Sequence, residues 1–217
     1  MSSNDTLSRH VTDELFWDPK VDSTAIAVSA NGGSVTLRGT VGGLREKREA
    51  QRAARRVYGV VAVDSQLKVK LLGDKGRADA ELRGDVLQAL MLNSVVPTTV
   101  DASVQDGVVA LTGTVSWWYQ RDEAEFVTTN IAGVLDVIDE ITIATPTPNA
   151  DNLQESIKQA FKRNASFDAE DLTVSTSAGT VTITGNIRSW AEHDAAIDAA
   201  WAAPGVTAVR DQLTIWY

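Results

Sequence analysis

Cysteine is absent from this chain of 217 residues, and histidine occurs only twice. Disulfide bonds, thiolate chemistry and cysteine-based zinc sites are therefore excluded. His10 and His193 lie far apart, and neither has acidic neighbours at the spacing of a metal site. We expect no transition metal and no bound cofactor.

Long hydrophobic runs are also missing. No stretch of about 18 apolar residues occurs, and residues 1–10 contain no apolar segment of the signal-peptide type. The sequence thus predicts no transmembrane segment and favours a cytoplasmic location.

Positive charge is in deficit, with 20 Lys and Arg against 29 Asp and Glu and a net charge of -9. This balance opposes nonspecific binding to nucleic acid or to an anionic bilayer, since both require a positive surface. The charge is uneven along the chain: residues 1–70 carry +3, residues 71–146 carry -8 and residues 147–217 carry -4. Any anionic partner should contact the first of these segments, and the basic first segment is also suited to self-association with the acidic second.

Known catalytic motifs are also missing from the sequence. The chain contains no Walker loop, Rossmann glycine fingerprint, Gly-x-Ser-x-Gly elbow or two-histidine zinc motif. Nothing in it pairs a nucleophile with a base, so we expect a protein that is not an enzyme.

What the chain does contain is a repeat of 72 to 74 residues, marked by two glycines 20 residues apart in each copy. Around the first glycine runs Gly-x-Val-x-Leu-x-Gly-x-Val or a close variant, and after the second comes Gly-Val-x-x-Val. A fixed period indicates one structural unit per copy. The repeated glycines, interpreted as turn and helix-cap positions, are Gly39 and Gly59, Gly113 and Gly133, and Gly185 and Gly205.

Each copy has the same succession of hydrophobic patterns. Apolar residues at helical spacing come first, then two alternating runs joined by a turn such as Asp106-Gly107, then an alanine-rich helix and a last alternating run. In the third copy, Ser189 and Glu192 have the spacing of a capping box.

The predicted fold class is α+β, with three tandem α-β-β-α-β domains. The hairpin requires antiparallel strands and the crossover through the second helix requires parallel ones, so each three-stranded sheet is mixed, with both helices on its one apolar face. The predicted domains span residues 1–70, 79–144 and 151–217, joined by linkers at 71–78 and 145–150.

The pattern resembles the BON domain, named for bacterial OsmY and nodulation proteins. Trp17-Asp18-Pro19, Trp117 to Arg121 and Ser189 to Glu192 are similar to the signatures of OsmY-like proteins with three such domains. The resemblance implies a noncatalytic, transport-associated domain family connected with osmotic or envelope stress and with phospholipid contact. It also makes the periplasm the alternative location.

Two sets of side chains are candidates for partner contact. The second helix of the first copy is rich in arginine and would meet an anionic partner; its alternative interpretation is a solvated face with internal pairs such as Arg45 with Glu49. Tryptophans favour interfaces that are half apolar and half wet; most of the six are expected to pack inside, whereas two should be exposed. The candidates are Arg45, Arg48, Arg52, Arg55 and Arg56 for the first set, and Trp17 and Trp117 for the second.

The run Glu192-His193-Asp194 occupies consecutive helix positions, whose side chains point in different directions. We interpret it as a solvent-facing segment without a metal.

The function predicted from these features is a stress-related scaffold that binds protein or phospholipid surfaces. An alternative from another class is a potassium-binding or ion-responsive sensor, in which backbone carbonyls at the glycine-rich turns and carboxylates would hold the ion.

Overall fold

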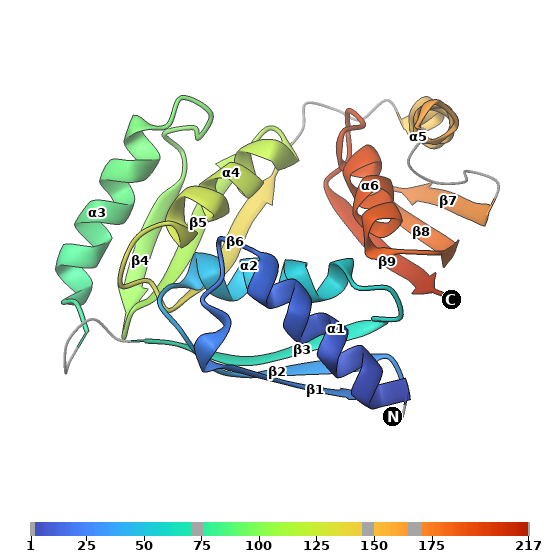
Figure 1. Cartoon of the computed structure of the whole chain (residues 1–217). Helices are drawn as coiled ribbons and strands as arrows, with labels where there is room; N and C mark the ends of the chain where they lie inside the picture. Colours follow the sequence, from blue (N-terminus) through green and yellow to red (C-terminus); the bar gives the residue numbers. More distant parts are fainter. Residues whose placement is uncertain (1–2, 71–75, 145–149, 165–170, 217) are drawn as a thin grey trace. The chain divides into compact units, whose positions relative to one another are not determined.

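The computed structural model describes residues 3–70, 76–144, 150–164 and 171–216 (Figure 1). Each repeat runs helix, strand, strand, helix, strand, as the sequence predicted. The first repeat comprises α1 (Ser3–Trp17), the 3-10 turn η1 (Ser23–Ala25), β1 (Ile26–Asn31), β2 (Ser34–Val41), α2 (Leu44–Arg56) and β3 (Ala62–Val69). The second comprises α3 (Asp79–Leu92), β4 (Asp101–Gln105), β5 (Val108–Val115), α4 (Trp118–Thr129) and β6 (Asp136–Ile143). The third comprises α5 (Ala150–Arg163), β7 (Leu172–Ser177), β8 (Thr180–Ile187), α6 (Trp190–Trp201) and β9 (Ala208–Ile215).

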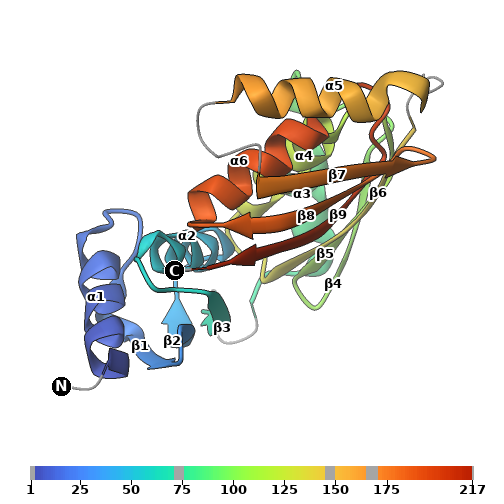
Figure 2. The same ribbon diagram turned by 90° about the vertical axis from the view of Figure 1, so that its right-hand side faces the viewer.

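Each repeat has its own three-stranded sheet, with the middle strand supplied by the second half of the hairpin. In the first and third repeats the hairpin strands pair antiparallel, and the last strand pairs parallel to the middle one. The predicted mixed sheets are thereby confirmed. Figure 1 shows α1 and α2 on one side of the first sheet, and Figure 2 shows α5 and α6 on one side of the third.

The core of each repeat lies between the helices and this face of the sheet. In the first repeat, Val11 and Leu15 of α1 pack with Val35 and Leu37 of β2 and with the alanines of α2. In the third, Ile157 and Phe161 of α5 take the same place. Small alanines let α2 and α6 approach the sheet closely, which explains why both helices are alanine-rich at their buried positions.

The hairpin turns have left-handed backbone conformations at both central residues. Asp106 and Gly107 have φ angles of 51° and 76°, and Ala178 and Gly179 have 48° and 79°. These angles are those of a type I′ turn, whose twist matches that of the strands it joins.

Gly39 and Gly185 lie inside β2 and β8, rather than at the turn or cap positions that the sequence analysis assigned to them. Their φ angles are 135° and 144°. A β-carbon at Gly39 would lie 1.9 Å from the carbonyl oxygen of Ala25, and one at Gly185 would lie 2.2 Å from that of Asp171. The glycines are needed because the preceding loop passes directly against the strand; Gly113 occupies the corresponding position in β5.

The second helix of every repeat begins at a bulky residue, and an acid or amide two positions further on reaches back to the preceding loop. Glu46 accepts a hydrogen bond from the amide of Gly42, Gln120 from that of Ser116 and Glu192 from that of Arg188. In the third repeat, Ser189 Oγ also accepts from the amide of Glu192. These bonds satisfy amides that the helix itself leaves without a partner.

The described residues are distributed over two compact units, and the second repeat contributes to both. One unit consists of Met1–Thr112 with Glu123–Glu140, and the other of Gly113–Asp122 with Ile141–Tyr217. Among the helices that the structure describes, none has the length and apolar character needed to cross a membrane.

Candidate functional site

The arginine-rich helix α2 is partly occupied by contacts within its own repeat. Arg56 donates hydrogen bonds to Glu14 Oε1 and Asp18 Oδ2, at 2.8 and 2.7 Å. Asp18 is buried, and its bond from Arg56 is the main reason that its pKa lies below the ordinary value; the same bond raises the pKa of Arg56. Arg56 is therefore a structural ion-pair partner that ties α2 to the end of α1.

The expected pair between Arg45 and Glu49 does not form. Glu49 is buried and instead accepts from Lys20 Nζ and Arg52 Nη1, at 3.4 and 3.3 Å. The side chain of Glu49 is only 7% exposed, whereas Arg45 is exposed. Arg52, with its side chain 60% exposed, keeps wide solvent access beside this internal pair.

Arg45 and Arg48 contact the acidic second repeat, within the first compact unit. Arg48 forms an ion pair with Glu125, and Arg45 donates to Asn130 Oδ1 while its guanidinium lies 5.6 Å from the centre of the Phe126 ring. Arg55 is half-buried. Association of the first repeat of one copy with the second repeat of another remains a prediction.

Several of the most exposed apolar side chains lie at equivalent places, at the C-terminal end of the first helix of a repeat. Leu15, Leu90 and Phe161 are buried at matching positions, and the two residues after each are exposed. These helix-end pairs are Phe16 with Trp17, Met91 with Leu92, and Lys162 with Arg163. Two repeats thus present apolar pairs to solvent, and the third presents a basic pair.

The two tryptophans singled out from the sequence differ in exposure. Trp17 is 79% exposed and meets Phe16 edge to face, with ring centres 5.9 Å apart. Trp117 is 37% exposed. Trp216, expected to pack inside with the others, is 74% exposed because it follows the end of the edge strand β9.

His193 is not solvent-facing, contrary to the sequence interpretation. Its side chain is 15% exposed and lies between two carboxylates, with Nδ1 2.9 Å from Asp194 Oδ1 and Nε2 2.7 Å from Asp211 Oδ2. The Trp190 ring packs against the imidazole at 4.9 Å between centres. Hydrogen bonding to Asp194, together with Asp211, raises the pKa of His193 despite the opposing effect of burial.

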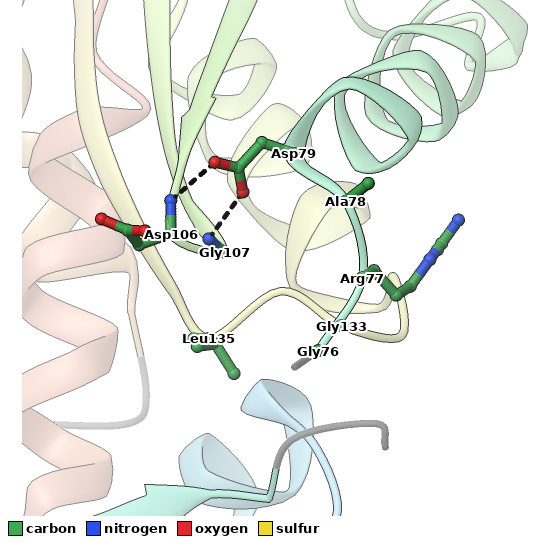
Figure 3. A pocket seen from close by; sticks show the side chains of 8 residues that line it. All are labelled: Gly76, Arg77, Ala78, Asp79, Asp106, Gly107, Gly133 and Leu135. Atoms are coloured by element: carbon green, nitrogen blue, oxygen red, sulfur yellow. Dashed lines mark hydrogen bonds between the residues drawn. The ribbon is translucent and has the colours of Figure 1, made fainter. Parts of the chain in front are cut away.

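A hollow of about 470 Å³ lies at one end of the second repeat, beside the start of α3 (Figure 3). Asp79 Oδ2 accepts from the amide of Asp106, and Oδ1 accepts from that of Gly107, at 2.9 and 3.0 Å. Arg77 points away from this turn, donating to Asp85 and to the carbonyl of Ala132. The turn here presents amide donors to a carboxylate, so Asp79 holds the hairpin to the helix.

The first repeat has the same arrangement. Asn4 Oδ1 accepts from the amide of Gly32 at 3.1 Å, beside a hollow of about 490 Å³. In the parts of the chain that the structure describes, no group of three or more His, Asp or Glu side chains is placed to hold a metal ion.

Comparison with known families agrees with this architecture. The BON domain model matches residues 3–70, 78–145 and 149–215, which together cover most of the chain. The chain belongs to the BON domain family, and its three repeats are three BON domains.

Among curated proteins, the chain is similar to "Osmotically-inducible protein Y" of Escherichia coli (strain K12). The two are 32% identical over 126 residues, which cover 56% of this chain and 63% of that relative. The chain thus spans less than two thirds of the relative's length.

Among solved structures, the chain aligns with two of CdsD, described as a structural protein of the type III secretion system of Chlamydia trachomatis. Both share 14% identity and cover 97% of this chain, with 92% and 98% of the other chain and TM-scores of 0.27 and 0.28. TM-scores and identities this low support no conclusion about the fold or the function of the present chain.

Proposed function

We propose that this chain is a noncatalytic, osmotic-stress-related binding protein that docks onto a phospholipid surface through the ends of its first helices. The relative's name supports the connection with osmotic stress. The observation that carries the docking proposal is the recurrence of an exposed pair directly after a buried core residue, at the same position in each repeat.

The chemistry of the three pairs suits the boundary between headgroups and acyl chains. Trp17 and Phe16 are large and aromatic, and tryptophan prefers this boundary because its ring is apolar with one polar edge. Met91 and Leu92 can bury apolar area in the acyl region. Lys162 and Arg163 can meet phosphate groups, and their long stems reach the headgroup layer.

The charge of the chain limits how such docking can work. A net charge of -9 repels an anionic bilayer, so attraction must be local. The exposed Arg52 on α2 supplies such a local charge in the first repeat. Apolar insertion at the helix ends supplies the part of the binding that salt does not weaken.

Co-sedimentation with vesicles of mixed phosphatidylcholine and phosphatidylglycerol tests this proposal. We expect the chain to bind at low salt, and Trp17→Ala to weaken binding about thirtyfold, because burying a large aromatic side chain contributes on the order of 2 kcal/mol. Arg52→Glu should weaken binding at low salt and have little effect at high salt.

Trp216→Ala is the matched control, since Trp216 is nearly as exposed as Trp17 but follows a strand rather than a helix end. It should leave vesicle binding unchanged. Absence of binding at low salt, or equal losses of binding in the two tryptophan variants, would contradict the proposal of phospholipid docking through the helix ends. The partner would then be a protein surface, to be sought by pull-down.

A further inference from the structure

The second compact unit contains an aromatic hollow, distinct from the helix-end pairs. Its volume is about 560 Å³, and it is lined by Trp117, Trp118 and Tyr119 at the start of α4 and by Asp198, Trp201 and Ala202 at the end of α6. The Trp118 and Trp201 rings stack with centres 5.6 Å apart and planes 11° apart. Four of the six lining residues are therefore aromatic, three of them tryptophans.

The same hollow carries one carboxylate and no basic side chain among its six lining residues. Desolvation raises the pKa of Asp198, Asp194 adds to this effect, and His193 opposes it. The surroundings of Asp198 therefore disfavour its negatively charged form. A cation bound beside it would stabilise that charged form. Asp198, Trp117 and Tyr119 are exposed, so a dissolved ligand can reach them.

We propose that this hollow binds a methylated ammonium cation, with its N-methyl groups against the tryptophan and tyrosine faces and Asp198 balancing its charge. Tryptophan faces give the strongest cation–π attraction, and cages of such rings suit quaternary ammonium groups. A quaternary ammonium, unlike ammonium or lysine, has no N–H groups that donate hydrogen bonds to water, so aromatic walls can replace its hydration. The hollow is also large enough for a group with four methyl substituents.

Isothermal titration of the full chain with tetramethylammonium chloride tests the proposal, with sodium chloride holding the ionic strength constant. We expect saturable binding of tetramethylammonium and none of ammonium chloride at the same concentrations. Linear heats of dilution for both salts would overturn the proposal.

Two variants locate the site. Trp117→Ala and Asp198→Asn should each weaken tetramethylammonium binding about five- to tenfold, through loss of a cation–π wall and of the balancing charge. Trp216→Ala and Asp13→Asn are matched controls on exposed residues that do not line the hollow, and should not change the affinity. Unchanged affinity in both site variants, with circular dichroism showing that they are folded, would refute the assignment.

A methylated ammonium can come from a free solute or from a phosphatidylcholine headgroup, and competition separates the two. If choline displaces tetramethylammonium and phosphatidylcholine vesicles do not, the natural ligand is a free solute. If the vesicles displace it as well, the ligand is a lipid headgroup. Either result supports the cation site. Trp17→Ala should leave this affinity unchanged, so the failure of vesicle docking and the failure of this site can be told apart.

Discussion

At the scale of single residues, the imidazole of His193 forms hydrogen bonds with two carboxylates, Asp194 on its own helix and Asp211 on β9. It links α6 to the edge strand of the third sheet, and Asp198 adds a further negative charge on the same helix. Protonated imidazole donates from both ring nitrogens, so it can satisfy both carboxylates at once. The neutral ring can donate to only one of them.

The stability of the third repeat should therefore depend on the protonation of His193. Its pKa is raised above the ordinary value of 6.5, so the stabilisation is fully present below that value and is lost as pH rises through the folded pKa. The urea midpoint should fall between about pH 5.5 and pH 8.5, in the range where histidine titrates.

His193→Gln is the control for this dependence. The variant retains hydrogen-bonding capacity but cannot be charged, so the midpoint should be lower at the acidic end and should change less with pH. If chain and variant lose stability equally over this range, other groups dominate and the imidazole has no special part in it.

At the scale of elements, the repeats differ in how the first helix is held to the hairpin turn. Asp79 makes two bonds to turn amides, and Asn4 makes one. A carboxylate accepting from amides also lies at a favourable end of the helix dipole. In the second repeat, Asp79 is thus the side chain that attaches the hairpin turn to α3.

Asp79→Ala should lower the free energy of unfolding of the second repeat by about 1 to 3 kcal/mol, because two turn amides lose a charged acceptor. Urea denaturation, with hydrogen exchange of the Asp106 and Gly107 amides, would measure the loss. Asp79→Asn keeps one acceptor oxygen and should recover part of it. If the two amides are equally protected from hydrogen exchange in Asp79→Ala and in the unchanged chain, the contact with Asp79 does not stabilise the turn.

At the scale of the whole molecule, three similar domains on one chain can act together on a surface that each contacts weakly. Once one repeat is bound, the linkers keep the others at a high effective concentration near the surface. The helix-end pairs lie on separate repeats, so their contributions should be independent.

Removing both apolar pairs, with Phe16, Trp17, Met91 and Leu92 all changed to Ala, should weaken vesicle binding by about the product of the two separate losses. Vesicle titration of the two double variants and the quadruple variant would measure this. If the second pair has no effect once the first is gone, the repeats do not engage the surface together.

The sequence by itself determined the architecture of this protein, because its signals are local and occur three times. Alternating runs around Asp106-Gly107 specify a hairpin wherever the remaining chain goes, and the repeated glycines set the period. The mixed sheet followed from connectivity alone. Even the loop-to-helix bond of Glu192 is readable, since it depends on residues four apart.

Only the tertiary structure decided which of these side chains meet. His193 and Asp211 are 18 residues apart, and Asp18 and Arg56 are 38 apart, so no periodicity links them. Gly39 is needed because of the carbonyl of Ala25, which comes near only when the loop before β1 folds across β2. Exposure of Trp216 and stacking of Trp118 on Trp201 likewise depend on packing between distant segments, which the local pattern of apolar residues does not encode.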